Sequence, residues 1–162
     1  MTRSASEVLT RNADDLLVYF RRRVGDVDAA DLLADTLVVA WRRASTMPSE
    51  PEDARAWLFG VAHNTLLNHR RGIRRRNRLA DRLRGLMGTD STSPAADDGI
   101  EVRAAIDELG PERAELVRLV HWEGFSLADA AQILGKPAST VRNHYQQAKE
   151  ELRAALSQDL VT

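Results

Sequence analysis

The sequence contains no cysteine, so disulfides and thiolate metal sites are both excluded. No apolar run approaches the roughly 20 residues that a membrane-spanning helix needs. The first fifteen residues, MTRSASEVLTRNADD, lack the basic and then apolar layout of a secretory signal. Hydrophobic residues make up 43% of the chain, which is enough to form a buried core, and charged residues make up 29%, as in a soluble protein. We therefore expect a soluble protein of the cytoplasm.

The usual catalytic and nucleotide-binding motifs are also missing. The chain has no GxxxxGK[ST], no GxGxxG, no GxSxG and no HExxH. His63 and His69 are six residues apart, which places them on different faces of a helix and excludes a zinc pair. We expect no enzyme activity, no cofactor, no resident metal and no small-molecule substrate.

The net charge of −1 conceals an asymmetry between the two halves of the chain. Residues 1–84 hold 16 basic and 11 acidic side chains, whereas residues 85–162 hold 7 and 13. Within the first half, Arg70 to Arg84 includes eight arginines and one acidic residue, Asp81. A block of this kind is usually a solvated face, but such dense like charge also indicates a polyanionic partner such as nucleic acid.

Two helical domains are expected, joined by a linker. Residues 85–99, GLMGTDSTSPAADDG, are rich in turn formers and show no apolar periodicity, which is typical of a flexible linker. On both sides of it the apolar period is helical, so we predict an all-α protein with domains at 1–84 and 100–162. The expected helices span about 6–24, 28–44, 54 through the arginine block, 100–109, 112–122, 126–134 and 137–156.

Four expected faces in the first domain follow from helical spacing. The second helix should turn an apolar stripe inward and a mostly polar face outward. The third helix should have a buried stripe and continue into a basic ridge with a four-residue repeat. The predicted inward residues are Leu33, Leu37, Ala40 and Trp41, then Leu58, Val61, Ala62, Thr65 and Leu66; the outward ones are Asp31, Asp35, Val38 and Arg42, then Arg70, Arg74, Arg78 and Arg82.

The second domain has the outline of a helix-turn-helix unit. Ser126 and Asp129 have the spacing of a capping box, Gly135 ends that short helix, and Pro137 opens a longer one. Helix hairpins with glycine turns also occur in ordinary bundles, so the outline alone leaves both interpretations open. The first turns of the long helix are unusually polar, and such side chains bind base edges and phosphates: Ser139, Thr140, Arg142, Asn143, His144 and Gln147. Its inner face would be formed by Val141, Tyr145, Ala148 and Leu152.

The two halves together resemble a known family. Residues 109–152, with a proline-led helix, the turn EGFS, the helix AQILG and the start TVR of the last helix, resemble region 4 of the extracytoplasmic-function (ECF) sigma factors. Residues 26–43, DVDAADLLADTLVVAWRR, and 56–71, AWLFGVAHNTLLNHRR, resemble region 2 of the same family. Both regions occur in the family's order, so the joint resemblance is more specific than either part.

The resemblance implies a bacterial factor that binds the clamp helices and flap of core RNA polymerase and directs it to promoter DNA. It implies that loop 44–53 and Asn64 capture unstacked bases of the −10 element, and that the last helix, with the six polar residues already named, recognises the −35 element. It also implies an anti-sigma factor as a further partner. The residues implied in polymerase binding are Asp31, Leu32, Asp35, Thr36 and Val39, and those implied in backbone contacts near the −10 element are Arg70, Arg71, Arg74, Arg75 and Arg78.

Two other classes of protein are compatible with parts of the sequence. A stand-alone helix-turn-helix regulator would bind a palindromic duplex as a dimer, but no remaining segment resembles a dimerisation helix. An enzyme is opposed by the missing motifs. Because the last helix is less basic than is usual in the family, we expect weak DNA affinity from this domain alone.

Overall fold

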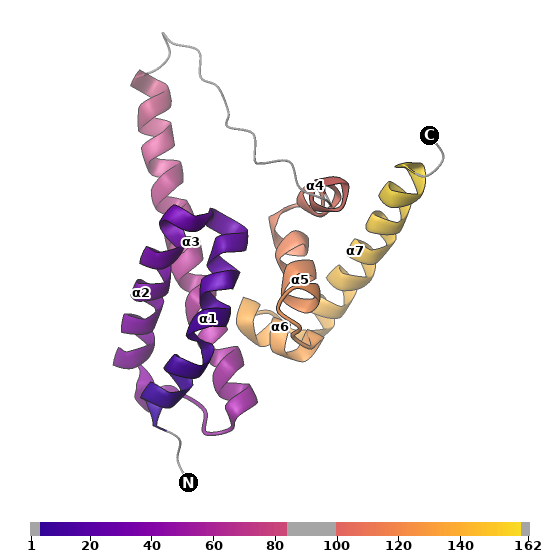
Figure 1. Cartoon of the computed structure of the whole chain (residues 1–162). Helices are drawn as coiled ribbons and strands as arrows, with labels where there is room; N and C mark the ends of the chain where they lie inside the picture. The colour runs from indigo at the N-terminus through magenta and orange to yellow at the C-terminus, as the bar shows by residue number, and fades with distance from the viewer. Residues whose placement is uncertain (1–3, 84–99, 160–162) are drawn as a thin grey trace. The chain divides into compact units, whose positions relative to one another are not determined.

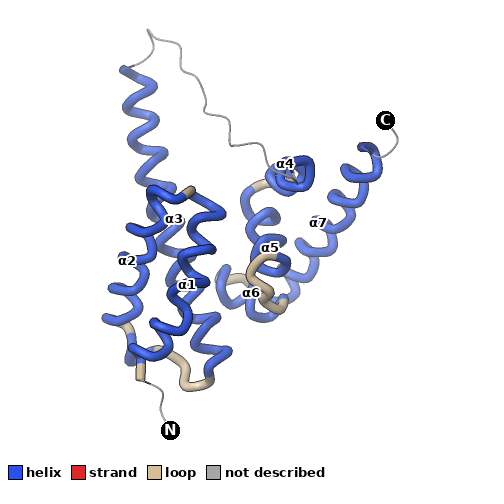
Figure 2. The backbone as a smooth tube through the Cα atoms, in the orientation of Figure 1, coloured by secondary structure: helices blue, strands red, loops and turns tan. Residues whose placement is uncertain are grey.

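The computed structural model describes residues 4–83 and 100–159, and throughout these ranges the regular elements are helices (Figures 1 and 2). The all-α prediction is confirmed. The chain divides into two compact units, Met1–Pro94 and Ala95–Thr162. The predicted linker, 85–99, lies outside the described residues. Among the helices that are described, none is long and apolar enough to cross a membrane.

The N-terminal unit is a bundle of three helices. They are α1 (Ala5–Val24), α2 (Asp26–Arg42) and α3 (Pro51–Leu83), with a short 3₁₀ turn, η1 (Ala44–Thr46), between the last two. Tyr19 lies at the centre, with its ring edge-on to Phe20 at 5.1 Å and to Phe59 at 5.4 Å between ring centroids. All three rings are fully buried together with Leu16 and Leu58. Burial of aromatic side chains of this size dominates core energetics, so these contacts hold α1 against α3.

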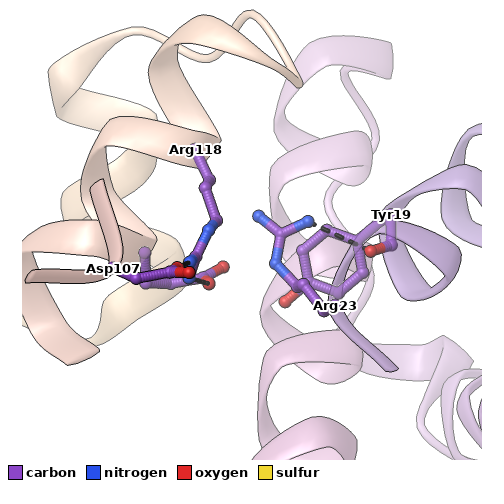
Figure 3. A network of polar contacts seen from close by, with 5 residues as sticks. Tyr19, Arg23, Asp107 and Arg118 are labelled. Atoms are coloured by element: carbon purple, nitrogen blue, oxygen red, sulfur yellow. Dashed lines mark hydrogen bonds and ion pairs between the residues drawn. The ribbon is translucent and has the colours of Figure 1, made fainter. Parts of the chain in front are cut away.

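The first two helices meet at one glycine. Gly25 has φ +83°, a backbone conformation that side chains disfavour, and its N–H donates to the carbonyl of Arg21 at 3.1 Å. Just before it, Arg23 donates to the carbonyl of Tyr19 at 3.1 Å and lays its guanidinium over the Tyr19 ring at 3.8 Å (Figure 3). The sharp reversal after α1 is therefore closed by backbone and side-chain contacts alike.

The buried face of α2 agrees only in part with the predicted one: Ala40 is buried as predicted, but Leu33 and Leu37 are half-buried. The structure buries Ala29, Leu32, Thr36 and Ala40, whereas Trp41, expected inside, is 59% exposed. Small residues on the buried face let α2 approach its neighbours closely. Thr36 fits there because its hydroxyl donates to the carbonyl of Leu32 at 2.7 Å, which satisfies the buried polar group.

Helix α3 is longer than expected at its start and runs well past the bundle. It begins at Pro51, three residues earlier than predicted, because proline suits the first helical position and Glu52 and Asp53 favour the positive end of the helix dipole. The predicted stripe is confirmed, with Thr65 half-buried and the other four residues buried. Leu66 is the last buried residue of a 33-residue helix about 50 Å long, so its second half projects (Figure 1).

The C-terminal unit contains α4 (Ile100–Glu108), α5 (Pro111–His121), α6 (Leu127–Leu134) and α7 (Ala138–Asp159). An ion pair between Arg118 and Asp107 joins α5 to α4 (Figure 3). The predicted boundaries agree within a few residues, and Pro111 occupies the expected first position of α5. The core cluster comprises Ile106, Leu109, Ala114, Val117 and Ala148, with Leu152 packed against it.

Candidate nucleic-acid interface

Helices α6 and α7 form a helix-turn-helix with the predicted caps. The hydroxyl of Ser126 accepts a hydrogen bond from the N–H of Asp129 at 3.1 Å, which fixes the start of α6. Gly135 ends that helix in the left-handed conformation, with φ 65° and ψ 36°. The N–H of Lys136 then returns to the carbonyl of Ala131 at 3.0 Å. A left-handed glycine, followed by a residue whose N–H bonds back to the last helical turn, is a common way for a helix to end. The sharp turn into α7 is therefore determined by the local sequence.

Helix α7 presents a polar face over its first turns. Val141 and Ala148 are buried and Tyr145 and Leu152 half-buried, as predicted for the inner side. Of the six predicted contact residues, two are half-buried, Thr140 and His144, and the others are exposed: Ser139, Arg142, Asn143 and Gln147. The exposed residues form a continuous outer surface of donors and acceptors, which is what base recognition in a major groove requires.

One residue of this face was missed by sequence reasoning. Gln146 is exposed and lies three positions after Asn143 and four after Arg142, at the spacing that places side chains on one helix face. That periodicity was available in the sequence. Gln146 therefore belongs with the candidate base contacts.

Two contacts brace α7 against α5. The hydroxyl of Tyr145 lies 3.0 Å from Nε2 of His121, and the two rings stack with centroids 6.0 Å apart. On the opposite flank, Arg113 of α5 donates to Gln147 at 2.8 Å and pairs with Glu151. The helix is thus held on both sides, and its polar face is presented in a fixed orientation.

A third contact ties the turn itself to α5. Nζ of Lys136 lies 2.8 Å from a carboxylate oxygen of Glu112. The hydrogen bond and charge of Lys136, with a smaller contribution from the charge of His144, lower the pKa of Glu112 below its ordinary value of 4.5. The carboxylate is therefore ionised near neutral pH and holds the basic turn residue in place.

The outer face of α2 combines acidic and apolar side chains. Asp31, Asp35 and Val38 are exposed as predicted, with Val38 at 49%, and next to them Val39, implied in polymerase binding by the resemblance, is also exposed. Trp41, on the same side, is 59% exposed. We call these five residues the α2 patch. Exposed apolar residues that gather in this way commonly mark protein-binding surfaces.

Two predicted members of this surface lie in the core instead. Leu32 is 4% exposed and Thr36 is fully buried, so neither can touch a partner bound to the folded unit. Their burial follows from the register of α2, which turns them toward the bundle. They lie on the side of α2 that packs against the bundle, and the α2 patch lies on the exposed side.

The predicted base-capturing loop is shorter than expected. Only residues 43–50 separate α2 from α3, and they include η1. The guanidinium of Arg43 lies 5.9 Å from the centre of the Trp57 ring, which is half-buried beside it on α3. The sequence pattern favours core packing for Trp57, but its partial exposure makes it a candidate platform for a stacked base. Its contact with Arg43 is tertiary, and no sequence signal indicated it.

Asn64 is exposed on α3 but does not lie next to the start of that helix. Thirteen positions separate it from Pro51, which corresponds to about 20 Å along the helix axis. The loop and Asn64 are therefore two separate points, several nucleotides apart on a single strand. The structure does not bring them together into one pocket.

The arginine ridge lies on the projecting half of α3. Arg71, Arg74, Arg75 and Arg78 are exposed and Arg70 is half-buried. Arg70, Arg74 and Arg78 follow one another at four-residue spacing, so they form a row along one side of the helix. Beyond Leu66 no described residue of α3 is fully buried, and the exposed Arg74 and Arg78 are open to a long anionic surface such as a DNA backbone.

Within the ranges 4–83 and 100–159, no group of three or more histidine, aspartate or glutamate side chains is placed to hold a metal ion. The surface chemistry that the described residues do provide is a polar helix face, a basic helix ridge and an acidic-apolar patch. These suit macromolecular partners.

Comparison with known proteins gives matches over both units. The sigma-70 region 2 profile matches residues 8–84, and the sigma-70 region 4 profile matches residues 100–152. The chain is 31% identical over 148 residues to the ECF RNA polymerase sigma factor SigL of Mycobacterium tuberculosis, covering 89% of this chain and 84% of the relative. It is 26% identical over 155 residues to the ECF RNA polymerase sigma factor BldN of Streptomyces coelicolor, covering 91% and 58% respectively.

Solved structures agree with this. The sigma factor RpoE from Bartonella quintana, in complex with the anti-sigma factor NepR, is similar with a TM-score of 0.68 and 25% identity, covering 94% of this chain and 96% of that one. CnrH, in complex with the cytosolic domain of CnrY, gives a TM-score of 0.65 at 24% identity, covering 96% and 88%. The second likeness shows the fold alone.

Proposed function

Because this chain belongs to the sigma-70 family, as a sigma factor of the ECF type, we propose that its two units divide promoter recognition between them. The chain serves promoter-directed transcription initiation: it binds core RNA polymerase and directs it to promoter DNA. In our proposal the unit with α7 recognises the −35 element and the unit with α3 the −10 element. The observation that carries this division is the braced polar face of α7, within the residues that match region 4.

At the −35 element, the first turns of α7 enter the major groove. The exposed residues of its outer face contact base edges there, with Gln146 added to the predicted set. Thr140 and His144 lie at the edge of this face and are placed for phosphates or for supporting contacts. Direct base contacts of this type discriminate by about 1–3 kcal/mol for each good bidentate pair.

At the −10 element, the N-terminal unit captures bases of the opened strand. Loop 43–50 and Trp57 hold one unstacked base, and Asn64 contacts the strand farther along α3. The arginine ridge neutralises phosphates, a contribution that does not depend on base sequence. These contacts select the site at which the strands separate.

Strand separation itself needs the polymerase. Stacking averages about 1.4 kcal/mol per step, so opening roughly ten base pairs costs on the order of 14 kcal/mol. A small helical unit that captures a few bases does not supply that much. The α2 patch is the surface we assign to polymerase binding, because it joins exposed acidic and apolar side chains on one rigid helix.

The chain has no catalytic role in this proposal, since the polymerase performs RNA synthesis. It works in the cytoplasm, where polymerase and chromosome meet. The sigma factor RpoE is bound to the anti-sigma factor NepR in its solved structure, and CnrH to the cytosolic domain of CnrY. We extend this to the present chain: a separate anti-sigma protein masks the α2 patch or the outer face of α7 until a stimulus releases it.

Run-off transcription with bacterial core polymerase on a library of promoters tests the division. We expect protein-dependent transcripts that share two motifs at fixed spacing, and little binding of duplex by the protein alone in a gel shift. Asn143→Ala should change the upstream motif and Asn64→Ala the downstream one. Tight binding of duplex without polymerase, with no new transcripts, would support a stand-alone regulator instead.

A further inference from the structure

Arg113 reaches from α5 to two side chains on one flank of α7. Its Nη2 donates to Oε1 of Gln147 at 2.8 Å, and its Nη1 donates to Oε1 of Glu151. Gln147 and Glu151 are four positions apart and so share a helix face. The fork of the guanidinium matches this spacing and bridges the two.

The contact fixes which way the amide of Gln147 points. A guanidinium carries only donors, so the amide atom that faces Arg113 must be the oxygen. This orientation follows from the chemistry of the two groups alone. The amide nitrogen, with its two N–H groups, is then directed away from Arg113, on a side chain that is exposed.

The orientation limits what Gln147 can recognise. A glutamine recognises adenine by accepting from N6 through its oxygen while it donates to N7 through its nitrogen. Here the oxygen accepts a hydrogen bond from Arg113 of α5 at 2.8 Å, which turns it toward that helix and uses one of its two lone pairs. The amide is thus held with its oxygen away from the position that the adenine contact requires. A donor alone is matched best by the two acceptors of guanine, O6 and N7, or by O4 of thymine. Adenine offers only N7, and its N6 amino group would be left without an acceptor.

We propose that Arg113 is a specificity-determining residue that acts through Gln147: it makes Gln147 a donor and sets a preference for guanine or thymine over adenine at the base that Gln147 faces. The proposal rests on the function assigned to α7 and adds a residue outside that helix. Arg113 itself is a positioning residue.

We expect the bridge to persist in the complex, because two contacts hold the guanidinium at once. A hydrogen bond with one charged partner is roughly twice as strong as a neutral one. Glu151 holds the guanidinium from its other nitrogen, so Arg113 cannot swing toward the DNA without breaking an ion pair. Its side chain is 31% exposed, which leaves it partly shielded from solvent.

The test is run-off transcription by the full-length chain with core polymerase on a library in which every position of the −35 element is varied. The proteins are the wild type, Arg113→Ala, Gln147→Ala and Arg113→Lys. The position whose base preference disappears in Gln147→Ala is the one that Gln147 faces. At that position we expect the wild type to favour guanine or thymine over adenine by about tenfold, and Arg113→Ala to raise the relative use of adenine severalfold without changing the other positions.

Arg113→Lys retains the charge but has no fork to hold both partners, so it should shift the preference in the same direction by a smaller amount. Arg153→Ala is the matched control: it removes an exposed arginine from α7 itself, and should leave the preference at that position unchanged. Thermal melts of each variant, followed by circular dichroism, establish that the helical unit is folded.

Three results would overturn the proposal: a wild-type preference for adenine that depends on Gln147, a base preference in Arg113→Ala equal to that of the wild type, or no position that responds to Gln147→Ala. Asn143→Ala, measured on the same library, separates this from the wider assignment. If it alters the −35 preference while Arg113→Ala does not, only the role of Arg113 is refuted. If neither Asn143→Ala nor Gln147→Ala alters any position, α7 does not recognise bases.

Discussion

Tyr145 and His121 join α7 to α5 through a 3.0 Å hydrogen bond between the tyrosine hydroxyl and Nε2, and their rings stack with centroids 6.0 Å apart. Nζ of Lys149 lies over the Tyr145 ring, 5.2 Å from its centre. A single half-buried tyrosine thus contacts both the neighbouring helix and a basic side chain of its own helix. The orientation of the polar face of α7 depends on this contact as well as on Arg113.

The hydrogen bond can be measured with a double-mutant cycle. Tyr145→Phe and His121→Phe each keep an aromatic ring and remove the bond, so each should lower the free energy of unfolding of the C-terminal unit by about 1 kcal/mol or less. The double variant should cost clearly less than the sum, because the bond can be removed only once. Urea denaturation supplies the values; additive effects would show that the two side chains act independently.

Two glycines should respond oppositely to the same substitution. Gly25 has φ +83° and ψ 175°, a conformation that only glycine adopts readily, with open space where a Cβ would be, so Gly25→Ala meets backbone strain alone and should destabilise the N-terminal unit by roughly 1–3 kcal/mol. Gly72 lies inside α3, where the nearest side-chain atom to a Cβ would be Nη2 of Arg76 at 3.9 Å. Gly72→Ala should therefore increase helix stability, by up to about 1 kcal/mol. Thermal melts followed by circular dichroism compare the pair, and a shift of equal sign in both would contradict the argument.

If the α2 patch binds core polymerase, changing its exposed side chains should weaken that binding without lowering the stability of the N-terminal unit. Trp41→Ala and Asp35→Arg change exposed side chains, so each should weaken binding to core polymerase by about tenfold while the melting temperature moves little. Val18→Ala, at an exposed valine of α1 outside the patch, serves as the control. Thr36→Asp, which buries a charge, should instead unfold the unit. Fluorescence anisotropy with labelled protein measures the binding.

The arginine ridge should act through charge alone. Replacing Arg74 and Arg78 by alanine should weaken promoter binding by the holoenzyme to a similar degree for all sequences. The slope of log affinity against log salt should fall by about 0.9 for each phosphate that is no longer neutralised. The lysine double variant keeps the charges and should restore most of the slope. A change in base preference, with the slope unaltered, would assign the ridge a different role.

Acid should remove the contribution of Glu112. Because Lys136 lowers the pKa of this carboxyl, its ionised form stabilises the folded unit at pH values above the ordinary 4.5, and the contribution is lost as the pH falls through the lower folded value. Glu112→Gln should therefore cost a few tenths of a kcal/mol at pH 7, since the pair is exposed, and nothing at pH 2. Urea unfolding at both pH values tests the sign; a larger difference at pH 2 would contradict it.

Local signals in the sequence were sufficient to predict the helices and most of their ends. Ser126, Gly135 and Pro111 occupy the capping positions that their chemistry predicts, since each acts through backbone atoms a few residues away. Boundaries shifted where two local preferences competed, as at Pro51, which suits both a loop and a first helical turn.

The register of α2 was harder to predict because that helix is apolar on two sides. Leu32 and Trp41 are both hydrophobic, and periodicity alone does not tell which faces the core when Val38 and Val39 also lie outside. Contacts between helices were not predictable at all: nothing in the sequence pairs Arg113 with Gln147, thirty-four positions apart.

The unbroken helix α3 also fixes the distance and the relative direction of Asn64 and Arg78. Asn64 and Arg78 are fourteen positions apart on one uninterrupted helix, so about 21 Å separates them along the axis, and their directions differ by only about 40°. If Asn64 contacts the opened strand as proposed, inserting one residue between them would turn Arg78 by about 100° away from that strand, whereas inserting seven would restore the direction and add about 10 Å. In the proposed function, the distance between the bases bound at Asn64 and the phosphates neutralised by Arg78 is thus set in helical turns, and α3 has no loop between them that could adapt to a promoter with a different distance.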